Sequence, residues 1–193
     1  MKLKISLLIV LLFIVCGWSL NAQQMAVKSN LLYGAGALTP NVGAEFGLGS
    51  RTSLNLSGSY NPWNLEGSVA DNKKLVHWTG SAEYRWWTCQ SFSGHFFGVH
   101  ALGGQYNVSG YNVPMLFDKE YRYEGWAAGA GLSWGYHLML AGRWSLEFNV
   151  GAGYIYFDYD KYACDKCAVL EGNNVKHYFG PTRAGVNLVF MIK

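Results

Sequence analysis

Charged residues are scarce in this chain. They make up 14% of its 193 residues, whereas a typical soluble domain carries about 25%. This shortage argues against a fold whose whole surface faces water. Proline is also rare, with four residues, and no low-complexity run is present, which excludes a disordered chain. The length fits one domain, since domains run to roughly 100–200 residues.

Long apolar stretches are confined to the N-terminus. Two lysines among the first four residues precede an unbroken apolar run from Leu7 to Val15, and a short polar segment then ends at Ala22. This order is typical of a secretory signal peptide, and the run is too short to span a bilayer, which takes about 20 residues. We therefore expect residues 1–22 to be a signal peptide and residues 23–193 to form the mature domain.

The mature chain has almost no net charge. Without the two lysines of the signal peptide, 13 basic residues stand against 12 acidic ones, which leaves a net charge of +1. Nucleic-acid binding requires a basic patch or stripe, so we expect no nucleic-acid partner. No apolar run of 18 residues follows residue 22, and the sequence therefore predicts no transmembrane helix.

Alternation of apolar and polar residues dominates the mature chain instead. The pattern predicts strands with two unlike faces. It is clearest at 53–62, 76–87, 121–140 and 144–159, and weaker at 26–37, 41–49, 95–107 and 177–193. We therefore predict an all-β fold in which eight antiparallel strands form an up-and-down barrel. Short turns at 50–52, 88–94 and 141–143 alternate in this scheme with outer loops at 38–40, 63–75, 108–120 and 160–176.

The two faces of these strands differ in a way that does not suit a soluble barrel. A soluble barrel packs its large apolar side chains inward and exposes charge to water. Here one face carries Trp, Tyr, Leu, Phe and Val with almost no charge, while the other carries mostly Gly, Ser and Asn. Outer-membrane barrels have apolar side chains outside and polar side chains in the lumen. The pattern thus predicts a transmembrane β-barrel of the outer membrane, surrounded by lipid.

Two groups of residues follow from this orientation. An arginine that faces lipid at the midplane costs about 2–4 kcal/mol, and a buried ion without a partner is also costly. We therefore expect a neutral charge network in the lumen, made of Lys28, Glu45, Glu83, Arg85, Glu147 and Arg183. Aromatic residues near the strand ends of the outer face predict interfacial girdles, with Trp86 and Trp144 at one mouth and Tyr60, Trp126, Tyr156 and Tyr178 at the other.

Cys164 and Cys167 form a CxxC motif in the last loop. In an oxidising compartment we expect them to form a disulfide. Half of a zinc site, with His177 as a third ligand, and a reactive dithiol are the alternatives. Cys89 lies in a turn at the opposite mouth and would remain a thiol. We expect no metal ion and no cofactor.

Short motifs are spread through the mature chain: Asn61-Pro62-Trp63, Asp71-Asn72-Lys73-Lys74, Gly94-His95-Phe96-Phe97-Gly98, Gly104-Gln105-Tyr106-Asn107, Tyr123-Glu124-Gly125-Trp126, Tyr159-Asp160-Lys161-Tyr162, Cys164 to Cys167 and Tyr178-Phe179-Gly180-Pro181-Thr182. In combination they resemble a family of small Gram-negative outer-membrane barrels that is labelled a domain of unknown function. The resemblance implies an OmpA-like eight-stranded barrel without established catalytic residues. Members of that family are sometimes associated with fimbrial genes, which implies a surface or fimbrial protein as a partner.

Three functions are compatible with the sequence. The leading hypothesis is a structural or interaction protein that presents loops 63–75, 108–120 and 160–176. The second is a narrow channel for small solutes, which is disfavoured because eight strands leave an interior just wide enough for side chains. The third is a rim enzyme acting on lipid or peptide, with Asp158, Asp160 and His177 near one mouth. No serine or second acidic group stands at an interpretable spacing, so we expect no enzymatic activity.

Overall fold

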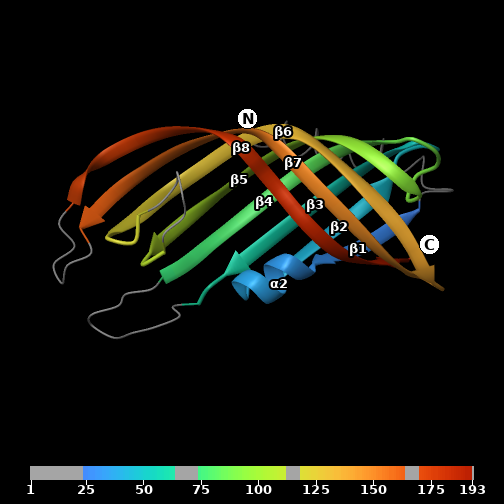
Figure 1. The fold of residues 1–193 in the computed structure, drawn as a ribbon, viewed down its shortest axis with the longest axis horizontal. Coiled ribbons are helices and arrows are strands. Elements are labelled where there is room, and N and C mark those ends of the chain that lie inside the picture. The colour runs from blue at the N-terminus through green and yellow to red at the C-terminus, as the bar shows by residue number, and fades with distance from the viewer. Residues whose placement is uncertain (1–23, 64–73, 112–117, 164–169, 193) are drawn as a thin grey trace, which may run out of the picture.

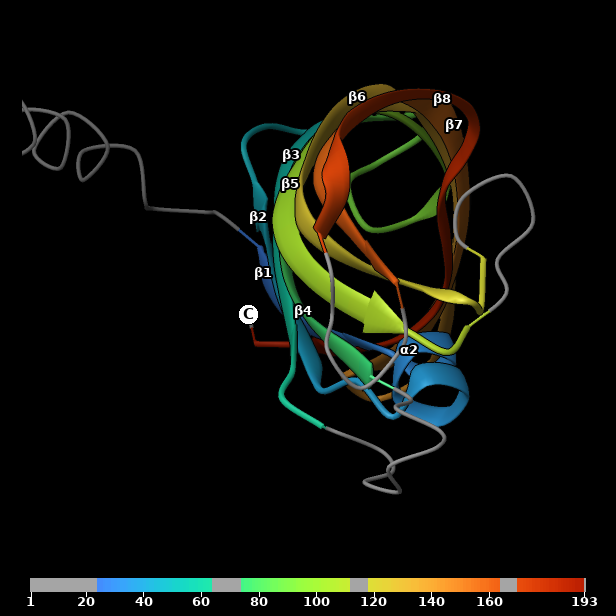
Figure 2. The same cartoon turned by 90° about the vertical axis from the view of Figure 1, so that its left-hand side faces the viewer.

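The computed structural model describes residues 24–63, 74–111, 118–163 and 170–192. Its strands are antiparallel and hydrogen-bonded in chain order, and the first pairs with the last, so that the sheet closes into an uneven ring (Figures 1 and 2). The eight strands are β1 (Met25–Asn30), β2 (Asn41–Gly47), β3 (Thr52–Asn61), β4 (Lys74–Trp87), β5 (Gly94–Ser109), β6 (Tyr121–Ala141), β7 (Trp144–Ala163) and β8 (Leu170–Met191). This arrangement confirms the predicted fold class. The predicted signal peptide, 1–22, lies outside the described residues.

The ring has two unlike ends. At one end, which we call the turn end, short connections at 48–51, 88–93 and 142–143 join neighbouring strands, β1 begins and β8 finishes. At the opposite end, which we call the loop end, the chain leaves β1, β3, β5 and β7. Successive connections alternate between the two ends because an up-and-down sheet reverses direction after every strand. Any site at the loop end is therefore built from segments far apart in the sequence.

A short helix, α2 (Leu31–Ala37), replaces the second half of the strand predicted at 26–37. Asn30 is the N-cap, and its side-chain oxygen accepts a hydrogen bond from the Leu32 amide at 3.0 Å. Asparagine is among the preferred N-cap residues. The strand prediction for 31–37 was wrong because the consecutive apolar residues Leu31, Leu32 and Tyr33 break the alternation, and the Asn30 cap favours a helical turn there. No helix in the described ranges is long and apolar enough to cross a membrane.

The last two strands are longer than predicted. β7 continues to Ala163 and β8 begins at Leu170, so most of the loop predicted at 160–176 is a two-stranded ribbon. Asp160 pairs with Asn173 in this ribbon. Alternation failed to reveal it because both faces of the ribbon carry polar residues, and a period of two is visible only when the faces differ.

A bulge in β8 reverses the alternation of its side chains. Thr182 is an extra residue in the pairing of β8 with β7. Beyond it, Tyr178 pairs with Ile155 on the interior face, and Phe179 points outward with 83% of its surface exposed. The prediction of Tyr178 in the outer aromatic girdle is thereby corrected, since one extra residue moves every later side chain to the opposite face.

Candidate functional site

The interior of the ring is filled in layers, beginning with an aromatic cluster at the turn end. Phe92, in the turn between β4 and β5, points into the ring and packs on Trp87, with ring centroids 5.8 Å apart. Trp87 also packs on Phe96 at 4.9 Å, and its indole N–H donates to the Ser53 hydroxyl at 2.8 Å. Because Trp87, Phe92 and Phe96 are almost wholly buried, they close this end of the ring to water. We call these three residues the aromatic plug.

A layer of charged residues lies next to the aromatic plug. Arg85 occupies its centre. Its Nη1 lies 2.9 Å from the carboxylates of Glu45 and Glu147, and its Nη2 lies 2.6 Å from the carboxylate of Glu83. The guanidinium carbon also lies 4.2 Å from the centroid of the Phe96 ring. All four charged side chains are completely buried. A buried arginine of this kind is stable only because its fork of N–H donors meets several carboxylates at once.

The two remaining cations complete this layer. The Lys28 ammonium contacts both Glu45 and Glu147, the latter at 2.5 Å. The Arg183 guanidinium reaches Glu83 at 2.7 Å, and 17% of its side chain remains exposed. The structure therefore places all six charged residues of the predicted lumenal network inside the ring and joins them through ion pairs. Three cations face three anions, so the layer has no net formal charge.

The sequence reasoning missed the neutral residues that complete the charge layer. Ser53 donates to Glu45 and Ser133 donates to Glu83. Asparagine side chains donate to the carboxylates at 3.1–3.3 Å, from Asn55 to Glu83 and from Asn149 and Asn187 to Glu147. These residues, like the charged ones, occupy inward-facing positions of their strands. The alternation of the two strand faces in the sequence could therefore have identified them. Such bonds matter because a buried carboxylate oxygen without a donor is strongly destabilising.

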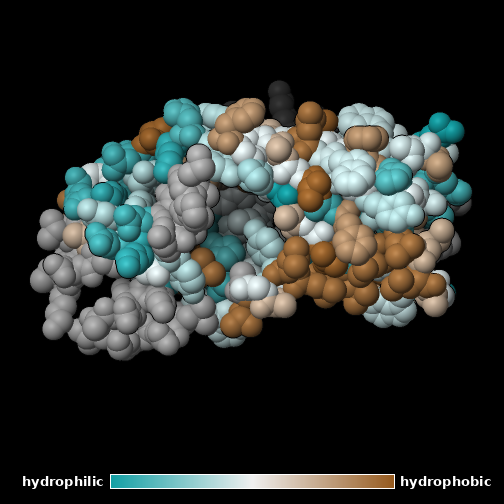
Figure 3. Space-filling view, viewed as in Figure 1, coloured by the Kyte–Doolittle hydropathy of each residue, from teal (hydrophilic) through white to brown (hydrophobic). Residues whose placement is uncertain are grey.

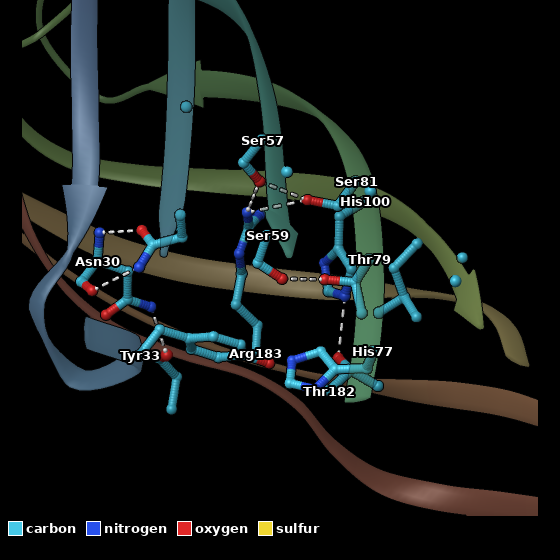
Figure 4. Close-up of a pocket in the computed structure, with 18 of the residues that line it drawn as sticks. Asn30, Tyr33, Ser57, Ser59, His77, Thr79, Ser81, His100, Thr182 and Arg183 are labelled. Atoms are coloured by element: carbon cyan, nitrogen blue, oxygen red, sulfur yellow. Dashed lines mark hydrogen bonds between the residues drawn. The ribbon is translucent and has the colours of Figure 1, made fainter. Parts of the chain in front are cut away.

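Hydroxyl groups form the next layer, towards the loop end. Two pairs bridge β3 and β4, Ser57 with Ser81 at 2.7 Å and Ser59 with Thr79 at 2.6 Å between the oxygens. Arg183 reaches across from β8 and donates to both Ser57 and Ser81 at 3.3 Å. Figure 4 shows these residues converging from opposite walls of the ring. They are called the hydroxyl layer below.

A cavity of about 550 Å³ lies on the loop-end side of the ring, and its lining includes the hydroxyl layer together with Lys28 and Glu147 of the charge layer. Such a volume is within the range of about 300–1,000 Å³ that holds small-molecule ligands. The hydroxyl layer and His100, whose Nε2 lies 2.9 Å from the Thr182 hydroxyl, line its polar part. The apolar part of its wall includes Leu75, Leu102, Val108, Ile155 and Phe157. The cavity is thus amphipathic: Leu102 lies opposite Ser81 of the hydroxyl layer, and the polar residues His77 and Tyr106 lie nearer the loop end.

Asp158, Asp160 and His177, which the sequence analysis considered as an acid–histidine site, do not form such a site. The His177 ring is hydrogen-bonded through Nδ1 to the Tyr154 hydroxyl at 2.5 Å. Asp158 and Asp160 instead accept hydrogen bonds from the Asn173 side chain at 3.3 and 3.2 Å. This part of the ribbon is a polar surface, without the contact between carboxylate and imidazole that acid–base chemistry would use.

One ion pair also lies on the β7–β8 ribbon. The Lys161 ammonium is 3.1 Å from the Glu171 carboxylate, and this hydrogen bond raises the pKa of Lys161 above its ordinary value. Both side chains are partly exposed, so the pair contributes little stability.

The predicted girdle residues, Tyr178 apart, lie on the outer face or at its edge. Trp86 and Trp144 are exposed near the turn end, and Tyr60 and Trp126 are exposed towards the loop end. Tyr156 is half-buried beside Trp126, with ring centroids 5.5 Å apart.

The cysteines of the CxxC motif, Cys164 and Cys167, lie outside the described residues. Cys89 is an exposed free thiol at the turn end. Within the described ranges, no three His, Cys, Asp or Glu side chains are grouped so that they could hold a metal ion.

Comparison with known proteins identifies one family. A family model described as "Protein of unknown function (DUF3575)" matches residues 7–192. No curated protein and no solved structure matches the chain.

Proposed function

We propose that this chain, which belongs to the DUF3575 family of proteins of unknown function, is an integral outer-membrane β-barrel. In this proposal it is a structural or interaction protein, exported by its signal peptide, 1–22. Lipid surrounds the ring, and the loop end faces the cell exterior, where it binds a surface or fimbrial protein.

One observation carries the proposal: the polarity of the ring is the reverse of that in a soluble protein. Arg85 and three glutamates are completely buried inside, whereas large apolar side chains such as Leu132, Val150 and Phe97 are more than half exposed outside. In water this surface would be a very large apolar patch, far above the few hundred Å² usual for monomers. In a bilayer the same surface is stable, and the polar interior is what outer-membrane barrels have.

The filled interior favours a structural role over the channel. A solute entering from the loop end would meet first the hydroxyl layer, then the charge layer and finally the aromatic plug. Each layer is held by contacts between different strands, including the bonds of Arg85 to Glu45 on β2 and Glu147 on β7. A conducting path would require several of these buried ion pairs to separate, which is costly.

The proposal is tested by locating the full-length protein and by measuring conductance. We expect it to fractionate with the outer membrane and to migrate faster on gels before heating than after, because a folded barrel resists detergent. We also expect no steady conductance in planar bilayers. Recovery as a soluble periplasmic monomer without detergent would overturn the membrane assignment, and regular conductance steps would favour the channel.

A further inference from the structure

The wall of the ring is lower on one side than elsewhere. β1 pairs with β8 only as far as Asn30, which lies opposite Asn187. In the described part of the chain, no strand pairs with the β1-facing edge of β8 over residues 170–186. We call this gap the side notch. It begins where the β1–β8 pairing ends, at Asn187, and runs along β8 past the exposed Phe179 to the loop end.

Helix α2 stands at the base of the side notch. The Asn30 side chain donates to the Ala184 carbonyl of β8 at 3.2 Å. Leu31, Leu32 and Leu38 are exposed beside it. Figure 3 shows a hollow opening between β8 and α2, next to a hydrophobic surface that extends over α2. Residues of both sides, Tyr33 of α2 and Arg183 of β8, line the cavity, so the hollow connects the cavity with the outer wall.

The side notch matters because the proposed function places lipid around the ring. Irregular backbone and open sheet edges do not face hydrocarbon, where their N–H and C=O groups would lack partners. Such backbone is tolerated at membrane depth only where it is buried in protein or lines a water-filled cavity, so the β8 edge at the side notch must find its hydrogen-bond partners on the cavity side. An occupant of this cavity must therefore meet hydrogen-bonding groups inside and hydrocarbon at the notch. A wholly hydrophilic solute satisfies the first requirement only, and a plain hydrocarbon satisfies the second only.

We propose that the cavity binds a single-chain amphiphile with an uncharged, hydroxyl-bearing head group, which enters from the membrane through the side notch. This inference rests on the proposed function, since lateral entry requires lipid around the ring. The head group lies on the hydroxyl layer, where Ser59 and Thr79 offer donors and acceptors. The chain lies along Leu102, Ile155 and Phe157 and leaves the cavity beside α2.

The head group is uncharged because the floor of the cavity is electrically balanced. Arg183 is the cation nearest the hydroxyl layer, and its guanidinium is already paired with Glu83. The other cations, Lys28 and Arg85, are paired with the remaining carboxylates. An anionic head would add a fourth negative charge to three cations that already face three carboxylates, and this excess charge costs free energy in a buried site. Hydroxyl groups can bind there without disturbing the ion pairs.

The test uses 1-monooleoylglycerol as the probe, with the purified full-length protein in detergent micelles. We expect saturable binding of one probe per protein. Leu102→Trp fills the cavity and weakens binding by about ten-fold or more, while Leu132→Trp, a matched change on the outer face, leaves it unaltered. Oleate, which has the same chain and an anionic head, binds the wild-type protein about ten-fold more weakly, and excess glycerol does not displace the probe.

Each outcome bears on a different part of the inference. Equal binding by wild type and Leu102→Trp, with both showing the heat-dependent gel shift of a folded barrel, would overturn the cavity as the site. Equal affinity for oleate would overturn the uncharged head group, and this comparison needs no variant. Displacement by glycerol would indicate a site for hydrophilic solutes. A protein that fractionates with the outer membrane but binds no probe refutes this inference alone, whereas a soluble protein refutes the proposed function.

Discussion

Arg85 and Glu147 are joined by two hydrogen bonds, of 2.9 and 3.2 Å, although they stand 62 positions apart and both side chains are completely buried. Two parallel bonds between guanidinium and carboxylate fix both the distance and the relative orientation of the groups. Since Arg85 belongs to β4 and Glu147 to β7, this contact spans the interior of the ring. It couples strands that share no backbone hydrogen bonds.

Replacing Arg85 by Met is expected to destabilise the fold by about 3–5 kcal/mol, because it leaves Glu45, Glu83 and Glu147 short of a buried partner. Arg183→Met should cost less, since Arg183 is partly exposed and Glu83 keeps Arg85. Urea unfolding in detergent measures both, with Lys119→Met, a change at an exposed lysine, as the control. Three equal midpoints would contradict the buried network.

Gly135→Ala is expected to destabilise the fold by about 1–3 kcal/mol through overpacking. A Cβ at this position would lie 2.3 Å from the Phe96 ring and 2.6 Å from the Phe148 carbonyl oxygen. Phe96 is completely buried beneath the Arg85 guanidinium and has little room to move. Gly80→Ala is the matched control, because a Cβ there meets no atom within 4 Å. Similar melting temperatures for both variants would show that the interior is more loosely packed than the structure indicates.

Leu132→Arg distinguishes lipid from water around the ring. Leu132 is 67% exposed on the outer face, and an arginine near the bilayer midplane costs about 2–4 kcal/mol. Leu170→Arg, at the loop-end start of β8 where the side chain is also exposed, should cost almost nothing. The measurement is folding into lipid vesicles followed by denaturant titration. If Leu132→Arg folds into vesicles as stably as Leu170→Arg, lipid does not cover this face.

The disulfide between Cys164 and Cys167 stays a prediction. In freshly isolated membranes, an alkylating reagent should label the exposed Cys89 thiol but not Cys164 or Cys167 until a reductant is added. Mass spectrometry of the labelled peptides reads all three positions in one sample, and Cys89 serves as the internal control for reagent access. Labelling of Cys164 and Cys167 without reduction would rule the bridge out.

The sequence determined the strand number, the direction of the two faces and the inward positions of the six charges. These properties are local, because successive side chains of a strand point to opposite faces, and a run of bulky uncharged residues can be recognised in a single strand. Lys28, Glu45 and Arg85 could therefore be placed on the interior parity without knowledge of their partners.

Only the tertiary structure decided which of these residues meet. The contact of Arg85 with Glu147 depends on the register of four consecutive strands, β4 to β7, and on closure of the ring. Ring closure links strand tilt and stagger, and neither is visible in one strand. The bulge at Thr182, which moves Tyr178 inward, likewise exists only relative to β7.

The cavity and its side notch were also decided only by the tertiary structure. The helix at 31–37 depends on the local Asn30 cap, but its consequence is a missing partner for β8, more than 130 residues later in the chain. Alternation predicts what a strand presents on its two faces. It does not predict where a neighbouring strand stops, because that depends on long-range pairing, and the side notch results from this difference in strand length.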